Sequence, residues 1–249
     1  ALPISSLDIL TTLYFHVMRV NPDAPQAPER DRFVLSKGHC TPALYSTMAQ
    51  RGFFPLEELK QFRRIEGHMS GHAEMRHVKG VDMSTGSLGQ GISAAVGMAL
   101  AGKADGRDYR VYALLGDGEI EEGQVWEAAM AAAKYRLDNL CAVVDVNGLQ
   151  IDGATADVMP SEPLDQKFEA FNWNVIRVDG HDYAALAEAF AAAAACKGKP
   201  TVLLARTVKG KGVSFMEGDY GWHGKAPNAE QYEKARAELA ARVAELEGK

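Results

Sequence analysis

The stretch Tyr112–Ala129 reads YALLGDGEIEEGQVWEAA, and it governs the fold because a buried strand ends within it on a charged turn. An apolar run stops at Gly-Asp-Gly, three acids follow within four residues, and a helical pattern comes next. A strand followed directly by a helix is the repeating unit of parallel α/β sheets. The carboxyl edge of such a sheet is where ligands bind, so the carboxylates at this turn call for a chemical explanation.

The same alternation continues along the chain. Buried strands are predicted for four apolar, β-branched runs: Arg110–Gly116, Leu140–Val146, Asn174–Gly180 and Pro200–Thr207. Helical patterns occupy five ranges: Ser6–Val20 after a serine cap, Leu88–Lys103, Gln124–Arg136, Tyr183–Lys197 and Asn228–Lys249. The Pro-rich range Asn21–Phe33 is expected to be a connecting loop. We predict an α/β fold, a parallel sheet with helices on both faces, in a single domain over residues 1–249 with a C-terminal helix at about 229–247.

Composition excludes several classes of protein. The hydrophobic share of 47% and charged share of 24% are ordinary for a globular domain. A net charge of −6 without a basic run argues against nucleic acid or an anionic membrane as partner. The apolar windows are too short or too polar to span a bilayer, and the first residues lack a signal-peptide pattern. Three widely spaced cysteines indicate reduced thiols, so we expect a cytoplasmic protein.

The Gly-Asp-Gly turn predicts a metal site. A lone carboxylate such as Asp117 repels a phosphate, but a divalent cation between the two removes the conflict. Asn147 follows the next strand, and a βαβ unit brings two such strand ends together. We expect Gly116 and Gly118 to let the backbone approach a bulky anion with positive φ. The alternative for each polar residue alone is a common turn residue.

Six segments, in order, resemble the transketolase family of thiamine-diphosphate enzymes. Gly-Asp-Gly followed by Asn147 is similar to the cofactor-binding motif, and the other segments narrow the resemblance to transketolase. The segments are RDRFVLSKGHCTPALYS (30–46), MSGHAE (69–74), VDMSTGSLGQGISAAVGMALA (81–101), LGDGEIEEGQVWEAA (115–129), VNGLQIDGAT (146–155) and GWHGKAP (221–227). The resemblance covers nearly the whole chain and implies the diphosphate-binding (PP-type) thiamine-diphosphate fold.

The resemblance implies roles for individual residues. Asp117, Asn147 and the backbone carbonyl of Leu149 would hold Mg²⁺, or Ca²⁺ or Mn²⁺, on the diphosphate of thiamine diphosphate. Gly118 would offer its backbone to the diphosphate, with His39 near that end.

Further positions would complete the site. Gly86 and Leu88 would line the cofactor rings, His72 would face the reacting carbon, and His223 would bridge cofactor and substrate. The cofactor-binding candidates also include Gly116 and Glu119. The catalytic candidates are His39, His72, His223, Glu122 and Glu127; singly, each histidine has the alternative of a structural or exposed loop residue.

The acids after the turn have two interpretations. Glu119 and Glu121 read as first-turn acids of the following helix, stabilised by its N-terminus by about 0.3–1 kcal/mol each. Glu122 and Glu127 match family positions of a carboxylate network that crosses a dimer interface. Because like charges held close cannot all ionise, such a network would share protons between paired active sites.

Only the first of three transketolase domains is matched, so the resemblance implies a split enzyme. We expect an N-terminal subunit that transfers a two-carbon ketol unit from a ketose phosphate to an aldose phosphate. It would act only with a C-terminal partner carrying the pyrimidine domain, in an α₂β₂ heterotetramer. Relatives have a histidine-bearing segment similar to GHxGG before the first helix. We expect that segment to precede Ala1 in the full chain; the alternative is that its histidine is lost.

Three alternatives remain open at this point. One is a subunit of another thiamine-diphosphate enzyme, similar to 1-deoxyxylulose-phosphate synthase or a 2-oxo-acid dehydrogenase. The second is a non-catalytic module that retains the fold. The third is a metal-dependent phosphate hydrolase, which typically needs more carboxylate ligands than this turn supplies.

Overall fold

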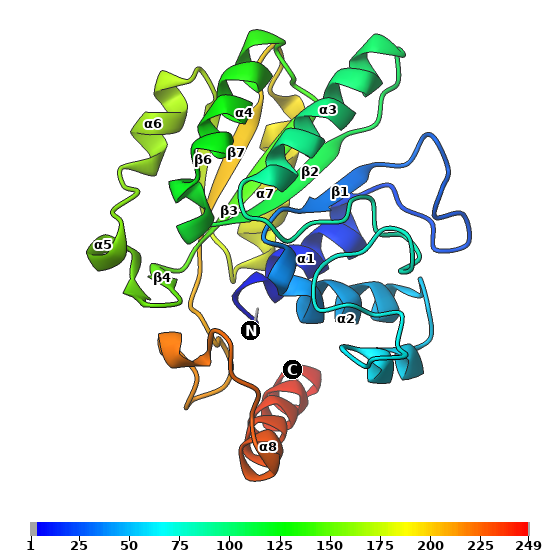
Figure 1. Ribbon diagram of the computed structural model, residues 1–249, viewed down its shortest axis with the longest axis vertical. Helices are drawn as coiled ribbons and strands as arrows, with labels where there is room; N and C mark the ends of the chain where they lie inside the picture. The colour runs from blue at the N-terminus through cyan, green and yellow to red at the C-terminus, as the bar shows by residue number, and fades with distance from the viewer. Residues whose placement is uncertain (1–3, 249) are drawn as a thin grey trace.

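A five-stranded parallel sheet forms the centre of the protein in the computed structural model, which describes residues 4–248 (Figure 1). Its strands, in spatial order, are β1 (Arg32–Leu35), β2 (Val111–Gly116), β3 (Leu140–Val146), β7 (Thr201–Arg206) and β6 (Asn174–Asp179). A small hairpin, β4 (Leu149–Gln150) with β5 (Gly153–Ala154), follows β3. The predicted parallel α/β fold is confirmed. The opening residues Ala1–Pro3, which precede the first helix, lie outside the described residues.

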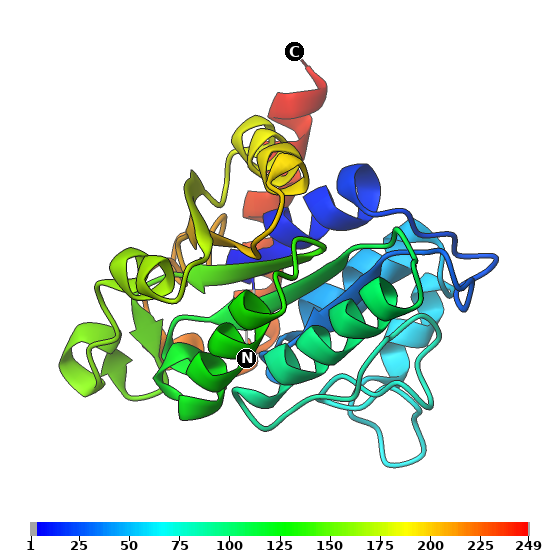
Figure 2. The same ribbon diagram turned by 90° about the horizontal axis from the view of Figure 1, so that it is seen from above.

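Helices cover both faces of the sheet, as Figure 2 shows from above. They are α1 (Leu7–Thr12), α2 (Thr41–Arg51), α3 (Gln90–Ala104), α4 (Gly123–Lys134), α5 (Thr155–Val158), α6 (Leu164–Ala170), α7 (Tyr183–Ala195) and α8 (Ala229–Glu247). Alternate strand residues separate two apolar cores. Tyr112 and Leu114 pack with α1, α2 and α7, whereas Ala113 and Leu115 pack with α3, α4 and α6.

The connections explain why one edge of the sheet gathers so many segments. From β1 through β3 to β6 the chain moves across the sheet with α3, α4 and α6 on one face. It then returns, with α7 on the other face, to insert β7 between β3 and β6. Because the connecting helix changes face when the chain reverses direction across the sheet, these crossovers keep the same handedness. The carboxyl ends of β1, β2, β3 and β7 therefore meet at one edge.

Three sequence predictions about local structure are wrong. The helix expected over Ser6–Val20 is a 3₁₀ turn (Ile4–Ser6), then α1, then a π segment (Leu13–Val17), and it ends where Met18 becomes extended. The expected serine cap is absent because the Ser6 hydroxyl oxygen accepts from Lys37 rather than from a backbone N–H, while its hydrogen is donated to Asp145. The Pro-rich loop is shorter than predicted, because Arg32 and Phe33 already pair with β2.

The C-terminal helix α8 lies apart from the two cores, below the sheet in Figure 1. A capping box between Asn228 and Gln231 starts it, and none of its residues is buried. Across residues 4–248 we find no helix with the combined length and hydropathy that crossing a bilayer requires.

Candidate active site

A cavity of about 370 Å³ opens at the carboxyl edge of the sheet. It is lined by every residue that the sequence proposed for cofactor binding: His39, His72, Gly86, Leu88, Gly116, Asp117, Gly118, Glu119, Asn147, Leu149 and His223. These residues come from five separate segments of the chain, so the fold brings together what the sequence scatters.

The Gly-Asp-Gly turn meets the end of β3 directly. The Asp117 carboxylate accepts hydrogen bonds from the backbone N–H groups of Gly118 (2.9 Å) and Gly148 (2.5 Å). Asn147 lies beside it on the cavity wall, and its side-chain oxygen accepts from the N–H of Leu149 (3.1 Å). Burial raises the pKa of Asp117 to about 6. A buried carboxylate and a neighbouring amide oxygen are ligands of the kind that a hard divalent cation prefers.

The glycines at this turn do not adopt the conformation we predicted. Neither Gly116 nor Gly118 has positive φ; Gly148 does instead, with φ 73°. That left-handed residue turns its N–H toward Asp117. Gly118 remains a close-approach position, because a Cβ there would lie 3.2 Å from Cβ of Gln150.

Glu119 acts at a different helix from the one expected. Its carboxylate is 2% exposed and accepts from the Ser36 hydroxyl and from the N–H groups of Gly89 (2.9 Å) and Gly116 (3.1 Å). Gly89 is the N-cap of α3, so the acid lies at the start of α3 rather than α4. Burial raises the pKa of Glu119. The residue fixes the turn after β2 against β1 and α3.

Lys37 and Asp145 form a buried ion pair at the cavity wall, a feature that the sequence alone did not lead us to predict. Asp145 is 0% exposed and Lys37 is 5% exposed. The Lys37 ammonium beside it holds the pKa of Asp145 below its ordinary range, against the opposing effect of burial. The sequence did contain a sign of such a pair: the strand LCAVVDV has a charged residue within an apolar run, and a buried charge requires a partner.

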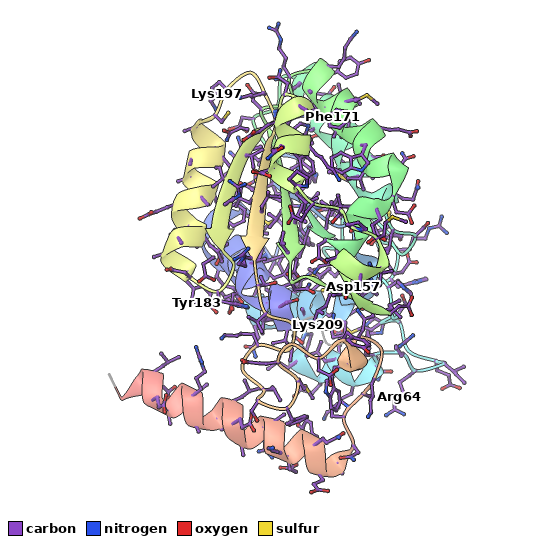
Figure 3. All side chains as sticks on the ribbon, turned by 90° about the vertical axis from the view of Figure 1, so that its left-hand side faces the viewer. Arg64, Asp157, Phe171, Tyr183, Lys197 and Lys209 are labelled. Atoms are coloured by element: carbon purple, nitrogen blue, oxygen red, sulfur yellow. The ribbon has the colours of Figure 1, made fainter. Side chains whose placement is uncertain are left out.

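Two histidines and a second lysine share one side of the cavity. The rings of His39 and His223 lie 5.1 Å apart between centroids, and Lys209 Nζ lies 3.1 Å from His223 Nδ1. Figure 3 shows Lys209 just below the strand ends. Burial and the nearby lysine charges lower the pKa of His39 to about 3 and that of His223 to about 4. Both rings are therefore neutral at pH 7, with one donor and one acceptor nitrogen each.

The segment between α2 and α3 contributes His72, Gly86 and Leu88 to the cavity. It is held against the end of β1, since the Thr85 hydroxyl donates to the Leu35 carbonyl at 2.6 Å. The His72 ring lies against the Gly86 backbone, where a Cβ would come within 3.4 Å of His72 Cδ2. His72 is exposed on this side of the cavity.

Glu122 and Glu127 do not line the cavity, and both are exposed in the single chain. Glu122 is the N-cap of α4. It packs against Gly89, where an added Cβ would lie 2.7 Å from Glu122 Cβ. Their network across a dimer interface stays a prediction.

Comparison with known proteins agrees with this geometry. The family model described as "Transketolase, thiamine diphosphate binding domain" matches residues 1–245. The chain is 48% identical over 236 residues to the 6-deoxy-6-sulfo-D-fructose transketolase subunit of Clostridium sp. strain MSTE9, covering 95% of this chain and 86% of that protein. It is 46% identical over 244 residues to an apulose-4-phosphate transketolase subunit of Phocaeicola vulgatus, covering 98% and 86%.

A solved structure shows the same fold. The crystal structure of transketolase from Campylobacter jejuni superposes with a TM-score of 0.86 at 31% identity, covering 96% of this chain and 42% of that one. The chain thus spans less than half of that longer transketolase, whereas the two relatives named as subunits are matched over most of their length. The chain belongs to the transketolase family, as its thiamine diphosphate-binding N-terminal subunit.

Proposed function

We propose that this chain binds thiamine diphosphate through a divalent metal ion and, with a partner chain, transfers a two-carbon ketol unit from a ketose to an aldose. The observation that carries the proposal is the Asp117–Gly148 contact, which joins the ends of β2 and β3 at the cavity beside Asn147. When bound, the cofactor supplies the carbanion chemistry that breaks and forms the carbon–carbon bond. The protein supplies orientation, charge and proton transfer.

Asp117, Asn147 and the Leu149 carbonyl would hold Mg²⁺, or Ca²⁺ or Mn²⁺. They fit a metal that also takes phosphate oxygens, because Mg²⁺ is typically bound by one or two carboxylates plus phosphate and water. The wall of the cavity also carries Lys37 and Lys209, whose charges suit a diphosphate. Gly118 has no side chain to stand between its backbone and a bound diphosphate, and a Cβ there would lie 3.2 Å from Cβ of Gln150.

The histidines would serve the sugar. Neutral His39 can donate a hydrogen bond to one oxygen and accept one from another. In His223 the Nδ1 atom accepts from Lys209, which leaves Nε2–H to donate to a hydroxyl or carbonyl oxygen of a ketose. His72, an exposed residue of the cavity wall beside Gly86, would contact the substrate. Relatives are named for a sulfonated and a phosphorylated sugar, so we infer an anionic ketose as donor.

A partner chain is implied by relatives that are named as subunits. We propose that the partner carries the pyrimidine-binding domain and that two copies of each chain form an α₂β₂ assembly. Glu122 and Glu127, exposed here, would meet across its interface.

The test is calorimetry of thiamine diphosphate binding with Mg²⁺, on the chain purified with its partner. We expect Asp117→Asn to weaken binding at least about a hundredfold, since loss of even an outer-shell metal partner costs 10–100-fold. The matched control is Asp157→Asn, an exposed residue of α5 outside the cavity (Figure 3), which should leave the affinity unchanged.

Metal-independent binding, or equal affinity of wild type and Asp117→Asn, would contradict the metal site. Turnover with a ketose phosphate but not with a 2-oxo acid is the expected substrate preference. The opposite preference would reassign the chain to another class of thiamine-diphosphate enzyme.

A further inference from the structure

The ammonium of Lys37 lies at the wall of the cavity and does not use all of its N–H donors within residues 4–248. It donates to the Ser6 hydroxyl (2.6 Å) and to the carboxylate of Asp145. Its aliphatic stem lies along the turn after β2, where a Cβ at Gly116 would be 3.5 Å from Lys37 Cδ. An ammonium has three N–H donors, and residues 4–248 accept two of them. One donor therefore remains for a group in the cavity that Lys37 lines.

Asp145, by contrast, is fully occupied. One carboxylate oxygen accepts from Ser5 (2.7 Å), Ser6 (2.8 Å) and Lys37, and the other accepts from Thr207. These donors come from the N-terminal turn and from the ends of β1 and β7, so the carboxylate joins three segments to β3. A carboxylate with this many donors has no free direction for a metal ion. It serves as a fixed counter-charge under Lys37.

We propose that Lys37 donates a charge-assisted hydrogen bond to the diphosphate of the cofactor, and that Asp145 is the positioning residue that fixes its ammonium at the cavity wall. The inference rests on the proposed function, which supplies the diphosphate. A diphosphate carries more negative charge at neutral pH than one divalent ion neutralises, so a buried cation beside the metal site is electrostatically complementary. Fixing the ammonium before binding lowers the entropy lost on association.

A purely structural role is the competing explanation, because the pair also joins β1 to β3. The two explanations predict different results. Removing one partner of a buried ion pair leaves an unpaired buried charge and destabilises the protein, whereas removing both partners can leave stability nearly unchanged. A double-mutant cycle with Lys37→Met and Asp145→Asn therefore isolates stability from ligand binding.

The experiment compares four proteins, wild type, Lys37→Met, Asp145→Asn and the double variant, each purified with the partner chain. Thermal melting without ligand measures stability; calorimetry with Mg²⁺ and either thiamine diphosphate or inorganic pyrophosphate measures binding. We expect each single variant to melt below wild type and the double variant to recover much of the loss. We expect Lys37→Met to weaken both ligands roughly tenfold to a hundredfold, the usual effect of one charge-assisted bond, and the double variant to stay equally weak.

Asp145→Asn should weaken pyrophosphate binding when Lys37 is present and should not weaken it further in the Lys37→Met background. Lys211→Met is the control, since Lys211 lies outside this cavity and should keep wild-type affinity. Recovery of affinity together with melting temperature in the double variant would overturn the inference, as would unchanged binding by Lys37→Met. Both outcomes leave the proposed function standing; absence of binding by the wild type would instead refute the proposed function.

Discussion

At the carboxyl edge of the sheet, charged side chains are buried and bonded to distant parts of the chain. The charged side chains of α8 stand in solvent, where Glu238 accepts from Ser214 of the preceding loop and Arg236 pairs with Glu233. Lys37 and Asp145 are joined across 108 positions of sequence. In α8 the ion pair of Arg236 with Glu233 spans one turn, with both side chains about two-thirds exposed. The first arrangement needs the whole fold; the second needs only a helix.

The difference indicates where the molecule is organised for chemistry. Each buried carboxylate at the sheet edge, Asp117, Glu119 and Asp145, accepts from more than one segment, so these side chains hold the cavity wall in place before any ligand binds. An exposed pair of the α8 kind contributes little to stability, typically below about 1 kcal/mol. Substitutions at the edge should therefore act on the whole protein, and substitutions in α8 should act locally.

Removing Glu119 should have the largest effect on stability. Glu119→Ala leaves the N–H groups of Gly89 and Gly116 and the Ser36 hydroxyl without their acceptor. At about 1–3 kcal/mol for each buried unsatisfied group, we expect a loss of about 3 kcal/mol or more in the free energy of unfolding. Urea denaturation of the ligand-free chain measures it.

Glu121→Ala is the matched control, two residues away. Glu121 accepts a single side-chain bond from Gln150 (2.7 Å) and is only partly buried, so its loss should cost less than about 1 kcal/mol. Equal losses of unfolding free energy in the two variants would show that side chains at the sheet edge contribute no more to stability than partly exposed ones.

The sequence predicted the architecture well because hydrophobic period and turn chemistry are local properties. Leu140–Val146 was placed without error, and Val111–Gly116 differs from its prediction by one residue. β1 was missed because four residues after a Pro-rich loop carry too little periodic signal. The first helix was predicted as continuous because a π segment has nearly the same apolar pattern as an α-helix.

The site was predicted in part, and its omissions share one cause. Side chains in motifs of known type, such as Asp117 and Asn147, could be assigned before the fold was known. Lys37 and Asp145 could not be paired, because their contact depends on the order of strands rather than on spacing in the sequence. The left-handed turn likewise falls at Gly148, which the sequence does not distinguish from Gly118.

The histidines at the edge should make the ligand-free protein sensitive to acid. His39 and His223 have folded-state pKa values of about 3 and about 4, below the ordinary 6.5. Below pH 6.5 the unfolded chain takes up protons that the folded chain does not, so stability falls as pH falls toward those values. Between pH 7.5 and 5 we expect a loss of up to about 2 kcal/mol per histidine.

Denaturation of His39→Asn and His223→Asn at the two pH values tests this. Each variant should lose less stability than wild type between pH 7.5 and 5. The exposed His77→Asn should behave as wild type. A wild-type stability that is flat over this range would contradict the burial of the two rings.

The apolar stripe of α8 should give the smallest effect. Leu239, Val243 and Leu246 are 42%, 52% and 64% exposed and follow one another at helical spacing. Their replacement by alanine removes little buried surface and raises helix propensity at Val243, so the free energy of unfolding of the ligand-free chain should change by less than about 0.5 kcal/mol per site. Leu186→Ala in α7, where the side chain is fully buried, should cost about 2–5 kcal/mol. If the α8 substitutions cost as much as Leu186→Ala, the helix packs on the body of the protein in solution and the contrast between the two regions fails.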